Sequence, residues 1–354
     1  MKNKVQLSSC SQSALHTDVK SSVKDFMNLW ENEGMDWSSW MEACEEARKE
    51  FAKMINAEPE EISIVSSVSH AISSVLTSID SLIGENEKQV IVSQTDFPCI
   101  GHVALSQTGS EVIFTKDYNE INASTDLITI PHVSYYDGTI ADLDELVIKA
   151  QSVKSYTFVD AYQSAGQVEI DVKKTEVDFL TAGMQKYLLG TPGIAFLYVK
   201  KDIAEKLTPK VTGWFGQANP FDFDGSKVDY ADGAVRFDTG TFPMLNGFTA
   251  NRALKILNDI GVENIQKYLQ NLSRYALEYA KENGLETVGS KDVTKKGSTT
   301  AIRIDNASVI EQELKERGVI VSARNDVIRI APHYYNNKND IKVAIDSIVE
   351  LIKH

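Results

Sequence analysis

Between residues 62 and 200 the sequence alternates short apolar runs with longer segments that have the length of helices. The runs are rich in β-branched and aromatic residues, which favour strands. Parallel strands need crossover connections, and helices usually supply them. The pattern therefore predicts an α/β unit, with a parallel or mostly parallel sheet covered on both faces by helices. The strands are expected at 62–65, 90–93, 112–114, 127–130, 156–160 and 194–199, and the helices within 69–82, 98–108 and 140–153.

Helical periodicity flanks this unit on both sides. Between residues 37 and 55, apolar residues recur at three- and four-residue steps, which predicts one amphipathic helix. Ser39 and Glu42 have the spacing of a capping box for its start. Beyond residue 245 the pattern predicts a small α+β unit. Its expected elements are helices at 246–259, 262–283, 308–317 and 340–352, and strands at 299–304, 319–321 and 327–330.

The charge balance of the 354-residue chain excludes several classes of partner. Asp and Glu number 50 against 36 Lys and Arg. A nucleic acid or an anionic membrane needs a positively charged face, whereas one small anion can still be held in a pocket. No apolar run approaches the roughly 20 residues of a membrane helix, and the start lacks the apolar core of a signal peptide. Cys10, Cys44 and Cys99 are widely spaced, which predicts no metal site and a reducing, cytoplasmic setting.

Ligands of such sheets bind beyond the carboxyl ends of the strands, and two polar features lie there. Residues 66–71, SSVSHA, follow one strand and open a helix, so their free N–H groups favour a phosphate socket. The alternative is an ordinary serine N-cap. Asp160 follows the strand YTFV, where a buried carboxylate needs a cationic or hydrogen-bonding partner such as a pyridinium nitrogen. The alternative is a helix cap or a structural ion pair.

Two cationic residues complete the set. Lys186 lies in GMQKYLLGTPG between an apolar strand and a turn. In a poorly solvated cleft its amine would lose proton affinity and act as a nucleophile, the alternative being a solvated lysine. Arg329 ends the last predicted strand, and its planar fork suits a carboxylate, the alternative being an edge-strand arginine. An anion socket, an aspartate, a lysine 26 residues later and a late arginine follow the order found in pyridoxal phosphate enzymes.

The sequence resembles the class V aminotransferases, a family that also contains cysteine desulfurases, kynureninases and isopenicillin N epimerase-like proteins. The resemblance extends from LSSCSQSAL at 7–15 to RIAPHYYNNKNDI at 329–341. Its most specific part is FVDAYQSAGQVEIDV…VDFLTAGMQKYLLGTPGIAFLYV at 158–199. The resemblance implies the fold of pyridoxal-phosphate-dependent transferases, with a large cofactor-binding domain at 21–244. A small domain would combine residues 1–20 with residues 245–354.

The resemblance also implies roles for individual residues towards pyridoxal 5′-phosphate. Lys186 would hold the cofactor as a Schiff base, and Asp160 would pair with the pyridine nitrogen and keep it protonated. Arg329 would bind the α-carboxylate of the substrate. Further expected contacts are Gln163 and Ser134 at the phenolic oxygen, Phe97 on the ring face, and Val68 and Ser69 at the phosphate. Gln185 is expected to contact the cofactor from the place of the family's histidine.

Thr241, in FDTGTFP, matches a threonine that in this family reaches the phosphate of the neighbouring subunit. This match implies a homodimer with its sites at the interface.

The chain departs from the family pattern at several places. The family often has Ser-x-His-Lys at the lysine, whereas this chain has Gly183, Met184 and Gln185 before Lys186. A serine contact to the phosphate is therefore missing, and Gln185 stands in the place of the histidine. No cysteine follows Cys99, which disfavours cysteine desulfuration, and Tyr162-Gln163 replaces the histidine pattern of kynureninases. The ring of Tyr162 belongs either to a substrate pocket or to the core.

The favoured function is an aminotransferase that acts on an α-amino acid through Lys186, with a keto acid as acceptor. The alternatives are an epimerase or a C–S or C–N lyase of the same family, and a binding protein that retains the cofactor without catalysis. A metal or phosphate hydrolase is disfavoured, because the six histidines are scattered along the chain.

Overall fold

The computed structural model describes residues 4–34, 36–84, 87–107 and 109–353. Its central strands are β2 (Ile62–Val65), β3 (Lys88–Ser93), β4 (Ser110–Thr115), β5 (Leu127–Pro131), β6 (Tyr156–Asp160), β7 (Phe179–Gly183) and β8 (Ala195–Val199). They form a seven-stranded sheet in the order β2-β8-β7-β6-β5-β3-β4. Only β8, among these described strands, runs against its neighbours, which are β2 and β7. The predicted mostly parallel sheet is confirmed.

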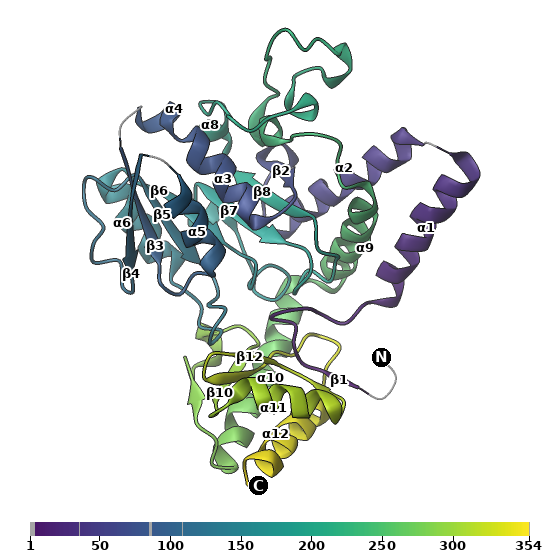
Figure 1. Cartoon of the computed structure of the whole chain (residues 1–354), viewed down its shortest axis with the longest axis vertical. Coiled ribbons are helices and arrows are strands. Elements are labelled where there is room, and N and C mark those ends of the chain that lie inside the picture. Colours follow the sequence, from purple (N-terminus) through teal and green to yellow (C-terminus); the bar gives the residue numbers. More distant parts are fainter. Residues whose placement is uncertain (1–3, 35, 85–86, 108, 354) are drawn as a thin grey trace.

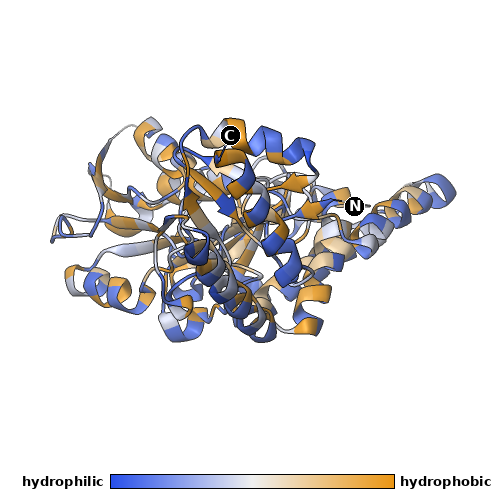
Figure 2. Ribbon diagram, turned by 90° about the horizontal axis from the view of Figure 1, so that it is seen from below, coloured by the Kyte–Doolittle hydropathy of each residue, from blue (hydrophilic) through white to orange (hydrophobic). Residues whose placement is uncertain are grey.

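Helices cover both faces of this sheet, as alternation along the strands requires. Val90 and Val92 of β3 face an apolar layer formed with α3 (Val68–Ser78) and α5 (Pro98–Ser106). Ile91, between them, faces a second layer formed with α2 (Trp37–Met54), α6 (Leu143–Val153) and α9 (Met244–Ile260). Figure 2 shows hydrophobic and hydrophilic residues alternating along the helices, as expected for elements that bury one side.

Helix α2 begins one residue after its cap. The carboxylate of Asp36 accepts a hydrogen bond from the N–H of Ser39 at 3.2 Å. The predicted capping box of Ser39 and Glu42 is therefore wrong. The cap lies three positions earlier, where an anionic side chain also interacts favourably with the positive end of the helix.

The C-terminal residues form the separate unit at the bottom of Figure 1. Its elements are α10 (Val262–Glu282), β9 (Thr287–Val288), β10 (Thr300–Arg303), α11 (Ala307–Glu316), β11 (Val319–Ile320), β12 (Ser322–Arg324), β13 (Val327–Ile330) and α12 (Lys338–Ile352). An antiparallel sheet has the order β12-β13-β10-β9. The N-terminal strand β1 (Val5–Gln6) pairs in parallel with β11.

Helices α1 (Thr17–Glu33) and α2 pack against α9, whereas α10 packs against α12. The chain therefore passes between the two units along α9 and α10, and the division at residues 244 and 245 stays a prediction. Three short helices complete the described part: α4 (Asp80–Ile83), α7 (Val172–Thr175) and α8 (Lys201–Ala204). None of the helices described here combines the length and hydropathy of a membrane-spanning segment.

The strand directions bring distant residues to one edge of the central sheet. Asp160 pairs with Thr181, and Gly183 pairs with Ala195, which also pairs with Val65. The carboxyl ends of β2, β6 and β7 therefore lie side by side. The segments that follow these ends carry the SSVSHA motif, Asp160 and Lys186.

Candidate active site

A pocket of about 400 Å³ lies at this edge of the sheet. Its walls come from the carboxyl ends of the central strands, from the N-terminal segment and from the hairpin of β12 and β13. The predicted site residues that line it are Val68, Ser69, Phe97, Gln163, Gln185, Lys186 and Arg329. The fold therefore brings together residues that are far apart in the sequence.

Lys186 is buried at this pocket, and its amine has no hydrogen-bond or ion-pair partner among the described residues. The Nζ atom lies 4.1 Å from the centroid of the Tyr162 ring and 5.6 Å from that of Phe97. Burial lowers the pKa of Lys186 to about 8, and the negative charge of Asp160 opposes this shift. A substantial fraction of the amine is therefore neutral at moderate pH, as a nucleophile or a base must be.

Lys296 is also buried, but its amine has hydrogen-bond partners. Burial also lowers the pKa of Lys296, to about 7. Its Nζ donates to the carbonyl oxygens of Thr299 at 2.7 Å and Gly297 at 3.1 Å, and it does not line the pocket. Lys296 therefore stabilises the C-terminal unit, whereas the Lys186 amine is free to react.

Asp160 lies at the end of β6 with its carboxylate buried, and Oδ1 accepts a hydrogen bond from the N–H of Tyr162 at 2.8 Å. Burial raises the pKa of Asp160. Asp96 is also buried, its Oδ2 has no partner within the described structure, and burial together with the charge of Asp160 raises its pKa. Two buried acids with no cation bonded to them in this described part favour a cationic ligand group beside Asp160.

The start of α3 offers donors to an anion. The Ser67 hydroxyl caps the helix by accepting from the N–H of His70 at 3.1 Å, so the N-cap interpretation is correct for this residue. The N–H groups of Val68 and Ser69 have no partner in the described part of the chain, and both residues line the pocket. Free N–H groups at the start of a helix bind phosphate well.

One amide side chain, Gln163, and two aromatic rings, Phe97 and Tyr162, also line the pocket. The Gln163 amide donates to the carbonyl of Cys10 at 2.9 Å, so the N-terminal segment closes over it. The Phe97 ring is 40% exposed and meets Tyr135 edge to face at 5.4 Å. Tyr162 lines the pocket too, which decides between the two interpretations of this aromatic residue. Phe97 is therefore open to a ligand.

Arg329 lines the pocket, but most of its N–H groups already donate to protein groups. Its Nη1 donates to the carbonyl of Tyr135 at 2.6 Å, and its Nη2 donates to the hydroxyls of Ser322 at 2.7 Å and Ser11 at 3.1 Å. Arg324 also lines the pocket, and its buried Nε has no partner among the residues described. The two arginines together suit a carboxylate ligand.

Arg324 and Asp96 were missed by the sequence analysis, although each carries a signal. Arg324 lies five residues before Arg329, across the Asn-Asp turn of a hairpin, and Asp96 follows a strand as Asp160 does. Because a hairpin brings its two arms together, a second arginine in SARNDVIR is expected beside the first.

Three predicted residues, Asp160, Ser134 and Thr241, are not among those that line the pocket. The Ser134 hydroxyl accepts from the N–H groups of Tyr136 at 3.3 Å and Asp137 at 3.4 Å, within a turn. Thr241 is exposed. The structure therefore gives Ser134 a local role, and the predicted reach of Thr241 into a partner subunit stays a prediction.

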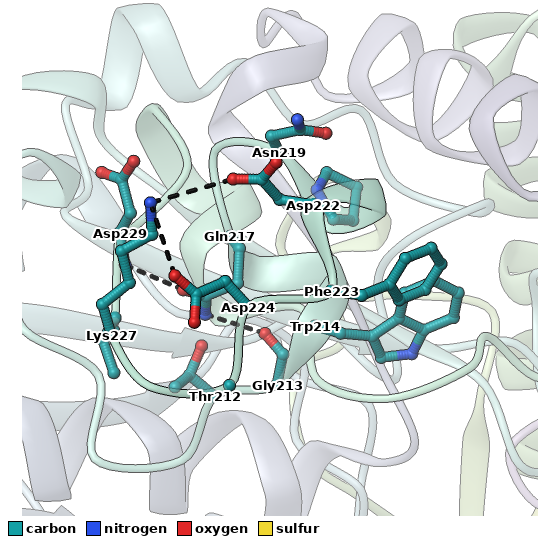
Figure 3. A pocket seen from close by; sticks show the side chains of 13 residues that line it. Thr212, Gly213, Trp214, Gln217, Asn219, Asp222, Phe223, Asp224, Lys227 and Asp229 are labelled. Atoms are coloured by element: carbon teal, nitrogen blue, oxygen red, sulfur yellow. Dashed lines mark hydrogen bonds and ion pairs between the residues drawn. The ribbon is translucent and has the colours of Figure 1, made fainter.

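A second pocket, of about 410 Å³, is drawn in Figure 3. It lies within the loop that spans Thr212 and Asp229, and Trp214 and Phe223 form one wall. Its one lysine, Lys227, pairs with Asp222 and Asp224. This pocket holds none of the predicted site residues, so the chemistry belongs to the pocket of Lys186.

The size and chemistry of the Lys186 pocket fit pyridoxal 5′-phosphate. It offers a free buried amine and donors for a phosphate at α3. The buried carboxylate of Asp160, whose charge acts on Lys186, suits a ring nitrogen. The described residues contain no group of three or more His, Cys, Asp or Glu arranged to hold a metal ion.

Comparisons with known proteins show the family of the chain. The family model for Aminotransferase class-V matches residues 29–345. The chain is 41% identical to the uncharacterized aminotransferase YcbU of Bacillus subtilis, over 98% of this chain and 94% of that protein. It is 26% identical to a probable cysteine desulfurase of Pyrococcus abyssi, over 87% of this chain and 83% of that protein.

A solved structure shares the fold. It is a mutant of C-DES with glycine covalently linked to its PLP cofactor, and it matches with a TM-score of 0.89 at 18% identity. The match covers 99% of this chain and 97% of that chain. The expected transferase fold is confirmed.

Proposed function

The chain belongs to the class V aminotransferases, a family of pyridoxal-phosphate-dependent enzymes, and we propose that it transfers the amino group of an α-amino acid to a keto acid. The observation that carries the proposal is the buried, unpaired amine of Lys186 in a pocket beside Asp160. Pyridoxal phosphate, when bound, supplies an aldehyde carbon open to amines and a ring that withdraws electrons from the substrate. Lys186 would hold this group covalently through its Nζ.

Lys186 and Asp160 act on different protons. The free Lys186 amine would act as a general base towards the Cα proton of the substrate, since its pKa of about 8 lies close to working pH. Asp160 holds a proton at the pyridine nitrogen, because a cation beside this buried carboxylate restores its charged form.

The remaining pocket residues bind and orient the substrate and the cofactor. Arg324 and Arg329 bind the α-carboxylate of the substrate, with Arg329 fixed by its protein contacts and Arg324 free to close on the ligand. Phe97 would cover the ring face, and Gln163 would donate to the phenolic oxygen. Val68, Ser69 and Gln185 would bind the phosphate.

Transamination is preferred over cysteine desulfuration because of the cysteines. Cys10 and Cys99 line the pocket, and no cysteine lies on the C-terminal hairpin. Burial raises the pKa of Cys99 to about 11, so this thiol stays protonated and is a poor nucleophile.

The reaction type is tested with a panel of amino acids and no acceptor. An aminotransferase yields keto acid in an amount equal to the enzyme, without ammonia, and turns over only when a keto acid is added. Ammonia released over many turnovers would show elimination, and inversion of Cα alone would show epimerisation. A coloured holoprotein that changes none of the amino acids would indicate a binding protein.

The attachment is tested by reducing the holoprotein with borohydride and mapping the modified peptide. We expect modification at Lys186, loss of it in Lys186→Ala, and retention in Lys296→Met, which removes the other buried lysine. Full turnover by purified Lys186→Ala contradicts the proposal.

We further propose a homodimer in the cytoplasm. The loop that rises at the top of Figure 1 exposes Phe221, Phe223 and Val228, and it leads to the exposed Thr241. Apolar side chains exposed together are typical of interfaces. The three cysteines are free thiols, as a reducing compartment would keep them.

A further inference from the structure

We propose that the phenolic hydroxyl of Tyr162 is a ligand of the cofactor phosphate, in a place that the missing side chain at Gly183 leaves open. The inference rests on the proposed function, because it needs pyridoxal 5′-phosphate in the Lys186 pocket. It concerns the phosphate end of the pocket, where the family pattern would put a serine in place of Gly183.

Tyr162 occupies the volume that a side chain on residue 183 would need. A Cβ atom built on Gly183 would lie 2.5 Å from Cζ, 2.6 Å from Cε2 and 2.7 Å from the hydroxyl oxygen of Tyr162. Such distances are far inside van der Waals contact, so a serine here excludes the phenol, and the phenol excludes a serine. The Tyr162 hydroxyl therefore lies close to where the hydroxyl of a serine in place of Gly183 would lie.

The Tyr162 hydroxyl is available to a ligand. It has no hydrogen-bond partner in the described part of the structure, and Tyr162 and Gly183 both line the pocket. Burial and the charge of Asp160 raise the pKa of Tyr162, so the phenol keeps its proton. A protonated hydroxyl next to a ligand anion can only gain by donating to it.

Tyr162 and the start of α3 line the same pocket. Strands β6 and β7 are parallel neighbours, so Tyr162 and Gly183 follow adjacent strand ends. Val68, Ser69, Cys99 and Tyr162 all line this pocket. The free N–H groups of Val68 and Ser69 and the phenol are therefore open to the same ligand.

The first test compares pyridoxal 5′-phosphate with pyridoxal, which lacks the phosphate. The full-length chain is stripped of cofactor, and dissociation constants are measured by absorbance for the wild type and Tyr162→Phe. Phe keeps the ring that fills the space at Gly183. We expect Tyr162→Phe to bind pyridoxal 5′-phosphate about 10- to 100-fold more weakly, the usual effect of losing a hydrogen bond to a charged group. Its affinity for pyridoxal stays within about twofold.

Tyr135→Phe is the matched control, because Tyr135 lines the same pocket but lies against Phe97. It should bind both compounds as the wild type does. If Tyr162→Phe loses affinity for both compounds equally, the inference is overturned, since this result shows a role of Tyr162 at the pyridine ring. Unchanged binding of both overturns it too.

The second test exchanges the two side chains. Gly183→Ser alone places its side chain against the Tyr162 ring and should weaken binding of pyridoxal 5′-phosphate at least about tenfold. The double variant Tyr162→Ala/Gly183→Ser restores both space and hydroxyl, and it should bind within about threefold of the wild type. A double variant no better than Gly183→Ser overturns the inference, provided that circular dichroism shows both folded.

Failure of the proposed function and failure of the role of Tyr162 give different results. If borohydride reduction of the wild type leaves Lys186 unmodified, the cofactor site itself is wrong. If Lys186 is modified and Tyr162→Phe binds the phosphate compound normally, only the role of Tyr162 is wrong.

Discussion

At the scale of single residues, the site depends on charged groups held where water does not solvate them. Lys186 is buried with no ion-pair partner among the described residues. Asp160 is buried close to Lys186, and Asp96 is buried close to Asp160. Each group is unfavourable in the folded chain without a ligand. The binding of a cofactor with a cationic ring nitrogen and a reactive carbonyl relieves these costs, so affinity and stability are coupled here.

Lys186→Met should stabilise the cofactor-free protein at pH 7. Folding lowers the pKa of Lys186 from its ordinary 10.5 to about 8, so between these values the unfolded chain holds a proton that the folded chain has lost. The stability of the wild type therefore rises with pH through this window. Below pH 8 the burial costs about 3 kcal/mol, which methionine removes.

Urea unfolding of the cofactor-free proteins at several pH values measures this effect. The gap between Lys186→Met and the wild type should narrow from pH 8 to pH 10.5. A constant gap would show that the amine is solvated.

The two arginines should respond differently to substitution. Arg324→Met removes a side chain whose Nε has no partner in the described protein, so KM for the amino acid should rise at least about tenfold with little loss of stability. Arg329→Met also leaves Ser322, Ser11 and the Tyr135 carbonyl without their donor, and should destabilise the protein by about 2 kcal/mol. Steady-state kinetics and thermal unfolding separate the two effects, and equal stability of the variants would contradict this account.

At the scale of elements, a buried ion pair fixes the strand from which the anion site starts. Arg48 of α2 donates to Asp238 at 2.7 Å, and Asp238 accepts from Ser63 and from the N–H of Ile64, both on β2. Asp238 also lies just before Thr241 in the chain. The ion pair therefore joins α2, β2 and the segment that we expect to face a partner subunit.

Asp238→Ala should destabilise the protein by about 3–5 kcal/mol, because it leaves the buried Arg48 guanidinium without its main anionic partner. Thermal unfolding measures the loss. Asp222→Ala is the control, since the Asp222 pair with Lys227 is exposed and should change stability little. A small effect at Asp238 would show that the exposed Glu45, which also bonds to Arg48, is sufficient.

At the scale of the whole molecule, the pocket exists only between parts of the chain that are distant in sequence. Its walls combine the N-terminal segment, the central sheet and the C-terminal hairpin. The hydroxyl of Ser13 donates to the carbonyl of Lys186 at 2.6 Å, so the N-terminal segment holds the lysine loop directly. The proposed second subunit would extend this pattern through Thr241.

In mass photometry the wild type should have twice the mass of one chain, which is 39.3 kDa. Phe223→Asp places a charge at an exposed apolar position of the loop, and should weaken the dimer at least about tenfold. Ile148→Ser, at an equally exposed position on α6, should have no effect. A monomeric wild type would contradict the proposed dimer.

The strands were predictable because their patterns are local. Buried parallel strands are continuous apolar runs, and every run expected between residues 62 and 199 forms a strand of the central sheet. The reversed direction of β8 was not foreseen, because pairing direction depends on distant partners. The cap of α2 was misplaced by three residues for a local reason: Ser39 and Asp36 both suit a helix start, and the periodicity does not choose between them.

The candidate site was predictable in part. Lys186 follows β7, Asp160 ends β6, and Arg329 lies near the end of β13. The rule that ligands bind at the carboxyl ends of strands indicated them. Asp96 and Arg324 carry local signals, but the sequence does not show that Asp96 is buried or that the Arg324 Nε has no partner in the described structure. The contact between Tyr162 and Gly183 was also beyond reach, because it joins positions on two different strand ends.

The sequence by itself determined the order of elements, the mostly parallel sheet and the residues whose chemistry suits a phosphate, a pyridine ring and a carboxylate. These properties follow from periodicity and residue type, which are local. Only the tertiary structure decided which lysine is free, which arginine is already engaged and which hydroxyl faces the open space at Gly183. Burial and hydrogen-bond partners depend on contacts between distant segments, and these contacts exist only once the chain has folded.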